Sequence, residues 1–377
     1  MDYVKISTSE VSVGQSLPWA VFDGHGKLLL RKGYVLSSQR QLDALMERGL
    51  FRNRSEAAEP ASDNEMPDLS EESLSPFQMV AHICHRLEKL FDSYQKHPEK
   101  FVSIIQKIVQ DVFELCETDP DAGLGAVHLY DTQRYTVVHP VHQALICAIV
   151  GFEMKLDEER TKSIIAAALT ANISMNALQE VLHVQTTPLT EAQRDQIYDH
   201  PDDSVKILKH LGVTDELWLT IVEQHHERID GSGYPANLTG DDIDEAAKLV
   251  AISDRYSAMV STREYREAIQ AKDALRNFFV SKGKEFDEAL SLLFIKTLGV
   301  FSPGTFVRLA NGEKGVVIRR STQNSMNPIV SSFITPRGGQ YVHPFIRDTS
   351  NSDYAIKETC DRPLDAKLNL HILWGYN

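Results

Sequence analysis

The chain has 377 residues, 42% of them hydrophobic, which is enough for about two or three cores at roughly 150 residues per domain. Its 39 Lys and Arg against 53 Asp and Glu leave a formal net charge of −14, which argues against a surface that wraps DNA or RNA. The N-terminus shows no signal pattern and no apolar run approaches the length of a membrane span, so we expect a cytoplasmic protein without a membrane partner.

The first 52 residues combine short β-favouring runs with one helical pattern. A glycine-containing turn at residues 23–26 separates two such runs, and residues 37–49 repeat apolar residues at helical spacing. We therefore predict a small mixed α/β module over residues 1–52. The segment 53–76 is acidic and proline-rich and has no aromatic residue, which predicts a flexible acidic linker.

Residues 77–299 repeat apolar residues every three to four positions in successive segments, which predicts helices. The predicted fold class is therefore mainly α, a helical bundle that follows the small mixed module. Beyond the bundle, apolar and polar residues alternate around Asn311 and Gly312, which is a hairpin signal. A small β-rich C-terminal appendix is predicted over residues 300–350, with a tail over residues 351–377.

Four histidines and one aspartate in the helical region lie in settings typical of metal ligands. His139 begins one predicted helix, His200 lies on another, and His225 and His226 end a third, whereas Asp254 lies within an otherwise apolar helix. A carboxylate in such a helix needs a hydrogen-bond partner, a counter-charge or a metal. Imidazole and carboxylate suit iron, manganese, nickel or zinc, and helical bundles build metal sites from ligands on different helices. Each histidine alone is more typical of a cap or a core position, so the metal hypothesis depends on their combination.

The most specific motif is HHERIDGSGYP at residues 225–235, whose glycines predict a loop with backbone shapes that other residues resist. Here the chain resembles the HD-GYP family, a branch of the HD-domain phosphohydrolases that typically cleaves the bacterial messenger cyclic di-GMP. The resemblance covers residues 123–300 and implies an HD-domain helical bundle. It assigns the GYP loop to Asp230, Gly231, Gly233, Tyr234 and Pro235.

The resemblance also implies roles for the five candidate ligands. His139 would match the first histidine ligand and Asp254 the late aspartate that completes the first metal site. His200, His225 and His226 would match the three histidines that hold a second metal.

Two arginines match the family positions that hold the phosphates of the dinucleotide. These residues, Arg263 and Arg266, are three positions apart on one predicted helix face. A guanidinium fork fits a phosphodiester well, which gives the assignment a physical reason beyond the resemblance. Without the resemblance, a solvated helix face would explain both arginines equally well.

The motif that names the superfamily is absent. The family pattern Leu-Leu-His-Asp-Ile-Gly-Lys aligns with residues 169–175, where Ala171 replaces the histidine, Asn172 the aspartate and Met175 the lysine. Asn172 offers one neutral carbonyl oxygen in place of the two anionic oxygens with which a carboxylate bridges two metals. Three catalytic positions are thus degenerate together.

The metal sites that remain are fewer than in the family. The first metal would keep only His139 and Asp254, unless His142, one helical turn further on, also binds. The second would keep its three histidines, a set that binds one ion. Tyr135 stands where some family members have a glutamate for a third metal, which disfavours a trinuclear site. We therefore expect one divalent ion (iron, manganese, zinc or nickel) or none.

These departures predict a degenerate member of cyclic di-GMP signalling whose phosphodiesterase activity is absent or strongly impaired. It would act as a nucleotide-binding or protein-interaction module. The expected partners are cyclic di-GMP and, through the GYP loop, diguanylate cyclase (GGDEF-type) domains; a homodimer is allowed. The main alternative is an active metal-dependent cyclic di-GMP phosphodiesterase with an atypical metal site. A third reading, a structural scaffold, predicts neither bound metal nor nucleotide affinity.

Overall fold

The computed structural model describes the side chains of residues 74–131, 133–261, 269–321, 323–363 and 368–376, and the backbone of four short strands nearer the N-terminus. The chain divides into two units, Met1–Glu72 and Ser73–Asn377.

The first unit contains a four-stranded sheet in the order β1-β4-β2-β3, and the paired strands run antiparallel. Its strands are β1 (Tyr3–Lys5), β2 (Val21–Phe22), β3 (Leu28–Leu30) and β4 (Phe51–Asn53). The helix predicted over residues 37–49 and most of the linker predicted over residues 53–76 lie outside the described residues.

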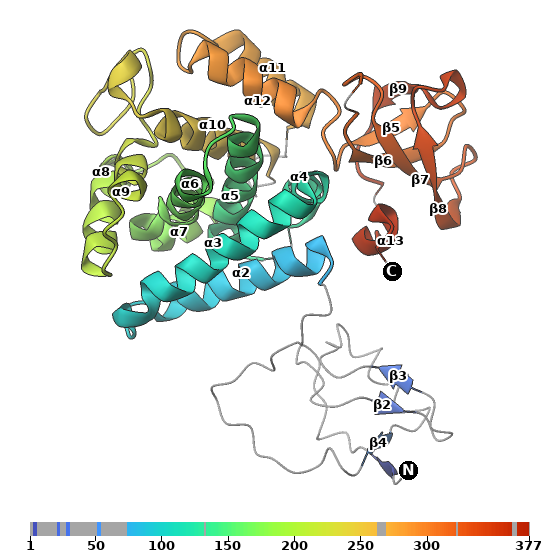
Figure 1. Cartoon of the computed structure of the whole chain (residues 1–377), viewed down its shortest axis with the longest axis horizontal. Helices are drawn as coiled ribbons and strands as arrows, with labels where there is room; N and C mark the ends of the chain where they lie inside the picture. The colour runs from blue at the N-terminus through green and yellow to red at the C-terminus, as the bar shows by residue number, and fades with distance from the viewer. Residues whose placement is uncertain are drawn as a thin grey trace. The chain divides into compact units, whose positions relative to one another are not determined.

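The second unit opens with a helical region, as the sequence pattern predicted (Figure 1). Its helices are α2 (Pro76–Ser93), α3 (Phe101–Thr118), α4 (Pro120–Leu129), α5 (Tyr135–Glu153), α6 (Glu158–Thr170), α7 (Asn176–Val184), α8 (Glu191–His210), α9 (Glu216–Gln224), α10 (Glu245–Val260), α11 (Ala271–Ser281) and α12 (Glu288–Leu298). The prediction of a mainly α fold is confirmed.

Helix starts follow from local side-chain chemistry. Ser75 and Gln78 form a reciprocal capping box at the start of α2, and Thr190 and Gln193 form another at the start of α8. Each pair satisfies backbone N–H groups that have no partner within the helix. The residues that align with the family's His-Asp dyad lie in a short loop. Helix α6 ends at Thr170, and the 3₁₀ turn η4 spans Ile173–Met175.

Helix α5 is the centre of the bundle. It packs against α6 and α10, and nearly all of its residues are buried, as expected of a helix that is apolar on every side. By length and composition it is the one helix among the described residues that could cross a membrane, but 89% of its apolar window is buried inside the protein. The expectation that no apolar segment reaches that length was therefore wrong for α5, and packing in the core accounts for its composition.

A five-stranded antiparallel sheet follows the helices, in the order β8-β7-β6-β5-β9. Its strands are β5 (Phe306–Leu309), β6 (Lys314–Arg319), β7 (Ile329–Ile334), β8 (Gln340–Asp348) and β9 (Ile356–Thr359). The predicted hairpin is present between β5 and β6, where Gly312 has a φ of +86°. The β-rich region extends past the predicted limit of residue 350, because β9 pairs with β5.

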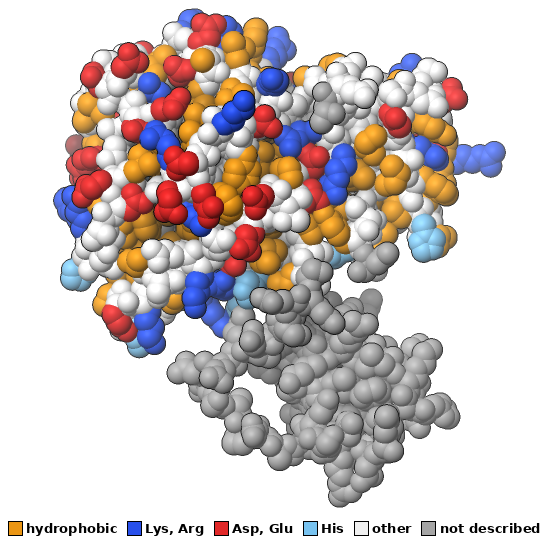
Figure 2. Space-filling view, viewed as in Figure 1, with side chains coloured by type: hydrophobic (Ala, Val, Ile, Leu, Met, Phe, Trp, Pro, Cys, Tyr) orange, Lys and Arg blue, Asp and Glu red, His pale blue; other side chains and the backbone are white. Residues whose placement is uncertain are grey.

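The last helix, α13 (Leu370–Trp374), fastens the predicted tail to the bundle. Trp374 is buried and meets the Phe77 ring of α2 edge-on, with ring centroids 4.9 Å apart. Beside it, Arg319 of β6 donates to both carboxylate oxygens of Asp119, at 3.0 and 2.8 Å. Sheet and bundle are thereby joined by apolar packing and a bidentate ion pair. On the face shown in Figure 2, cationic and anionic side chains are interspersed over the helical region.

Candidate metal centre and cavity

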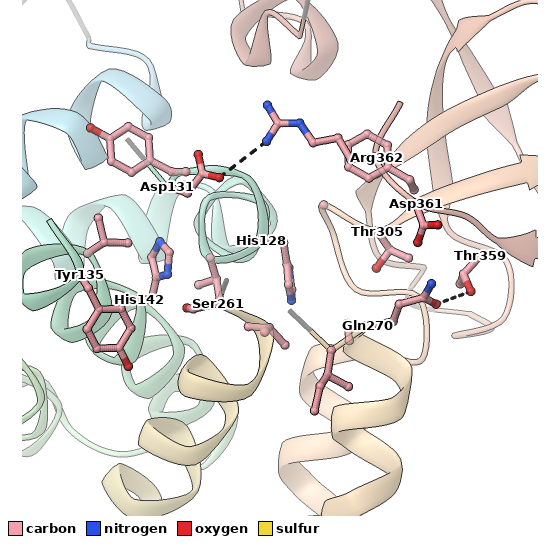
Figure 3. Close-up of a pocket in the computed structure, with 18 of the residues that line it drawn as sticks. His128, Asp131, Tyr135, His142, Ser261, Gln270, Thr305, Thr359, Asp361 and Arg362 are labelled. Carbon is pink, nitrogen blue, oxygen red and sulfur yellow. Dashed lines mark hydrogen bonds and ion pairs between the residues drawn. The ribbon is translucent and has the colours of Figure 1, made fainter. Parts of the chain in front are cut away.

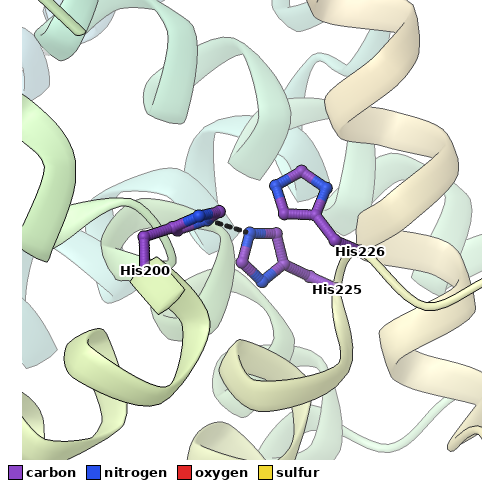
Figure 4. Close-up of side chains that lie close together, drawn as sticks. All are labelled: His200, His225 and His226. Carbon is purple, nitrogen blue, oxygen red and sulfur yellow. Dashed lines mark hydrogen bonds between the residues drawn. The ribbon is translucent and has the colours of Figure 1, made fainter. Parts of the chain in front are cut away.

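Three histidine side chains meet beside the core of the bundle (Figure 4). His200 lies on α8, and His225 and His226 directly follow α9. One ligand nitrogen from each ring lies within 4.8 Å of the other two, and the Nε2 atoms of His200 and His225 are 3.2 Å apart. The structure thus brings together the three residues that the sequence grouped as one metal site.

The backbone fixes which nitrogen of two rings carries the proton. Nδ1 of His200 lies 2.6 Å from the carbonyl oxygen of Ile197, and Nδ1 of His225 lies 2.6 Å from that of Val222. Because a carbonyl oxygen only accepts, each Nδ1 must donate, and each neutral ring then turns an Nε2 lone pair toward the other. The two Nε2 atoms are 3.2 Å apart, so their lone pairs repel one another unless a cation lies between them.

A proton does not fill the position between the two nitrogens near neutral pH. Burial and the neighbouring His225 lower the pKa of His200 to about 3, and burial lowers the pKa of His225 as well. Burial and His225 also hold the pKa of His226 well below its ordinary value. Three neutral imidazoles form a donor set for zinc, iron, nickel or manganese, and the two carbonyl partners act as the outer shell that orients such ligands. The cluster therefore fits one divalent ion.

The other two predicted ligands pair with each other. His139 of α5 donates from Nε2 to Asp254 of α10 at 2.8 Å, and Ser257 Oγ lies 3.2 Å from His139 Nδ1. Burial acts to raise the pKa of the Asp254 carboxyl, but the hydrogen bond and charge of His139 outweigh it and hold that pKa well below its usual range. His139 thus satisfies one oxygen of the Asp254 carboxylate, whose side chain is 17% exposed and lines the cavity described next.

A cavity of about 630 Å³ opens beside both groups of residues. Asn172 and Met175 contribute to its wall, whereas Ala171 is fully buried and does not. Among the described residues that line it, Asp254 is the single carboxylate, and there is no Lys or Arg. Within the described part of the chain, the wall therefore offers a phosphate no side-chain cation. Arg263 and Arg266, which the resemblance assigned to that task, lie outside the described residues.

Two further sequence expectations concern α5. The Tyr135 ring stacks on His139, with centroids 5.0 Å apart and planes at 16°, and on His183, with centroids 5.2 Å apart. An aromatic ring thus occupies the position that the resemblance assigns to the carboxylate of a third metal. His142 lines a different cavity from His139, so it does not join His139 and Asp254.

The GYP loop is held by a residue that the sequence analysis did not single out. Glu227 is 4% exposed, and its carboxylate accepts from the backbone N–H groups of Ala236 at 2.7 Å and Leu238 at 3.0 Å. A buried carboxylate with two backbone donors fastens both sides of the loop. The sequence carried a signal for this role. Glu227 directly follows two histidines in a glycine-rich motif, and a carboxylate in such a place needs hydrogen-bond donors.

Close packing explains the glycine and tyrosine of the loop. A Cβ on Gly233 would lie 2.4 Å from the backbone nitrogen of Arg228, so no other residue fits without moving the chain. The Tyr234 ring stacks on His226, with centroids 4.8 Å apart and planes at 25°, and it also lines the cavity. Tyr234 meets the Tyr198 ring at 4.7 Å, a neighbour in space that no sequence signal connected to the loop. The loop thus forms one wall of the metal centre.

Comparisons with known proteins agree with this architecture. The family model described as HD domain matches residues 130–290. The cyclic di-GMP phosphodiesterase PA4108 of Pseudomonas aeruginosa is 28% identical over 218 residues, which cover 58% of this chain and 52% of that protein. The cyclic di-GMP phosphodiesterase PdeB of Borreliella burgdorferi is 23% identical over 201 residues, 53% of each chain. This chain thus spans about half the length of these curated relatives.

A solved structure shares the fold. The HDG"Y"P protein Bd1817 of Bdellovibrio bacteriovorus superposes with a TM-score of 0.52 at 14% sequence identity, over 79% of this chain and 99% of that one. The helical bundle and the match of residues 130–290 identify this part of the chain as an HD domain. Its likeness to the named cyclic di-GMP phosphodiesterases agrees with the resemblance to the HD-GYP family that the sequence motif indicated.

Proposed function

We propose that this chain is a degenerate HD-GYP module of cyclic di-GMP signalling that binds the dinucleotide but does not hydrolyse it efficiently. The observation that carries the proposal is the composition of the cavity wall. Asn172 faces the cavity, and the single described carboxylate, Asp254, is already paired with His139 at 2.8 Å. A two-metal hydrolase needs a ligand that bridges both ions, and an amide oxygen is a poor substitute for a carboxylate.

One divalent ion (zinc, iron, manganese or nickel) would be held by His200, His225 and His226. Such an ion supplies positive charge that polarises a phosphate oxygen. The protein supplies the three oriented imidazoles, the Tyr234 ring at the cavity wall and the His139–Asp254 pair, in which His139 takes up one oxygen of the carboxylate.

The roles of the remaining expected groups are part of the proposal. Arg263 and Arg266 would meet the phosphates of cyclic di-GMP, since the described cavity wall has no cation of its own. The GYP loop, whose Asp230 and Ser232 side chains are exposed at its outer edge, would contact diguanylate cyclase domains. A homodimer is compatible with this assignment.

A second candidate is an active phosphodiesterase with an atypical single-metal site. One observation favours it: three histidines beside an open cavity resemble the catalytic metal sites that combine three protein ligands with a water molecule. The curated relatives named above are phosphodiesterases of cyclic di-GMP, which supports the same substrate for either candidate.

The test is a turnover assay on cyclic di-GMP, together with elemental analysis and a binding titration of the same preparation. The unmodified protein, Asn172→Asp, and the double variant Ala171→His with Asn172→Asp are compared. Asn172→Asp is the cleaner variant, because Ala171 is fully buried and an added imidazole overpacks its site by about 1–3 kcal/mol. Asn176→Asp, the same change four residues on and outside the cavity wall, is the matched control.

We expect binding by the unmodified protein, about one metal ion per chain, and turnover only after the carboxylate is restored at residue 172. Turnover by the unmodified protein comparable with that of PA4108, assayed in parallel, would contradict the degenerate assignment and favour the single-metal enzyme. A protein without metal and without nucleotide affinity would instead be a structural scaffold.

A further inference from the structure

A second cavity, of about 410 Å³, lies where the helical bundle meets the C-terminal sheet (Figure 3). Figure 3 shows Tyr135 and His142 on the helical side and Thr305, Thr359 and Arg362 on the side of the sheet. Its volume is within the range of about 300–1,000 Å³ that is usual for small-molecule sites. It would hold several waters at about 30 Å³ each, so its lining decides whether water or a larger molecule suits it.

Polar atoms without partners are concentrated around this cavity. His142 is 3% exposed and lacks a hydrogen-bond partner for its ring nitrogens, and the Thr305 hydroxyl and Nδ1 of His183 are buried without partners as well. The Tyr130 carbonyl beside His142 can engage only a donor nitrogen, so the acceptor nitrogen of the neutral ring stays open. Buried polar groups are almost always paired, so three such residues on one cavity indicate that something there binds them.

The lining favours a flat molecule with hydrogen-bonding groups on its edge. The stacked rings of Tyr135 and His183, with centroids 5.2 Å apart, form part of the wall, and His142 offers the nitrogen that accepts a hydrogen bond. Gln270 uses its amide oxygen to accept from the Thr359 hydroxyl at 2.7 Å, which leaves its NH₂ group to donate. An acceptor on His142 and a donor on Gln270 thus lie beside aromatic side chains, a combination that suits a heteroaromatic ring.

The charges around the cavity disfavour a highly charged ligand. Arg362 lies 3.9 Å from Asp131, so the cation at the rim already has an anionic neighbour. Asp361 adds a further carboxylate to the described lining, which contains no lysine. A phosphate would meet more negative than positive charge here, whereas an uncharged ring would not.

We propose that this cavity is a binding site for a planar, uncharged nitrogen heterocycle of nucleobase size. It is distinct from the metal centre, although Tyr135 and His183 line both cavities and separate one from the other. The ring could belong to a free nucleoside or be one base of a dinucleotide whose phosphates lie at the metal centre. Both sources present the same chemistry to His142, Gln270 and Thr305, and the site does not depend on whether the metal centre hydrolyses anything.

The test is a calorimetric titration of the full chain with guanosine and, separately, with cyclic di-GMP. Thr305→Val keeps the shape of the side chain and removes the hydroxyl, so affinity should fall about two- to tenfold, the value of one hydrogen bond. His142→Phe keeps an aromatic ring and removes both nitrogens, so it should weaken binding at least as much as Thr305→Val. Ser331→Ala, which removes an unpartnered buried hydroxyl in β7 away from the cavity, is the matched control.

Guanosine binding that is weakened by Thr305→Val, unchanged by Ser331→Ala and retained in His225→Ala supports a separate nucleoside site. If guanosine alone does not bind but Thr305→Val weakens cyclic di-GMP binding, the base of the dinucleotide is the ligand, and the proposal stands. If neither titrant responds to Thr305→Val, the cavity holds water only and the proposal is overturned. Loss of hydrolysis or of metal, by contrast, would bear on the metal centre alone.

Discussion

Replacing His225 with alanine should remove most of the stabilisation that a divalent ion gives this protein. The side chain is fully buried, and its Nε2 lies 3.2 Å from that of His200, so no solvent-exposed neighbour can take its place. An ion at one hundred times its dissociation constant stabilises the folded state by about 2.7 kcal/mol. Loss of an outer-shell partner alone lowers metal affinity by about 10–100-fold. Loss of the ligand His225 itself should therefore lower the affinity by at least about 100-fold.

At the same ion concentration, a 100-fold weaker site adds only about 0.4 kcal/mol to the free energy of unfolding. The assay is chemical denaturation of chelator-treated protein, with and without added Zn²⁺ or Mn²⁺. His210→Ala provides the control, because His210 lies exposed at the end of the same helix as His200. Equal stabilisation by metal in the unmodified protein and in His225→Ala, or none in either, would refute the lone-pair argument for a metal at this cluster.

Two more predictions concern the sheet and its junction with the bundle. Hydrogen bonds, that of Arg347 first, lower the pKa of Glu313 to about 2. Together these contacts should contribute up to about 3 kcal/mol of stability above pH 4.5, lost as pH falls toward 2, and the deficit of Glu313→Gln in denaturation midpoints should shrink over that window. Gly125→Ala should destabilise by about 1–3 kcal/mol, because its Cβ would lie 2.4 Å from the Trp374 ring; thermal unfolding measures this.

Two matched variants serve as controls for Glu313→Gln and Gly125→Ala. Glu358→Gln breaks an ion pair whose two side chains are each 50% exposed, so it should change stability by less than about 1 kcal/mol at any pH. Gly123→Ala, on the same helix as Gly125, meets only side-chain ends, at 3.3 Å or more, and should be neutral or stabilising. A pH-independent deficit for Glu313→Gln, or equal effects of the two glycine variants, would show that the contacts do not act as described.

The sequence by itself determined the fold class and the resemblance to the HD-GYP family. Apolar spacing in residues 77–299 indicates which helix faces are buried, and it predicted the helical region, although α4, α7, α11 and the first half of α8 were not singled out. The motif at residues 225–235 carried the resemblance to the HD-GYP family, and the structure places its histidines and its loop beside one another. The sequence did not predict β9 within the tail, because a four-residue strand becomes stable only through its pairing with β5.

Only the tertiary structure decided which candidate ligands meet. His200 is 25 residues from His225, and His139 is 115 residues from Asp254, so their distances depend on how four helices pack and not on local spacing. The structure separates the five into a cluster of three and a hydrogen-bonded pair. It also determines the tautomers that set two lone pairs against each other, because the backbone carbonyls that fix them belong to the folded helices.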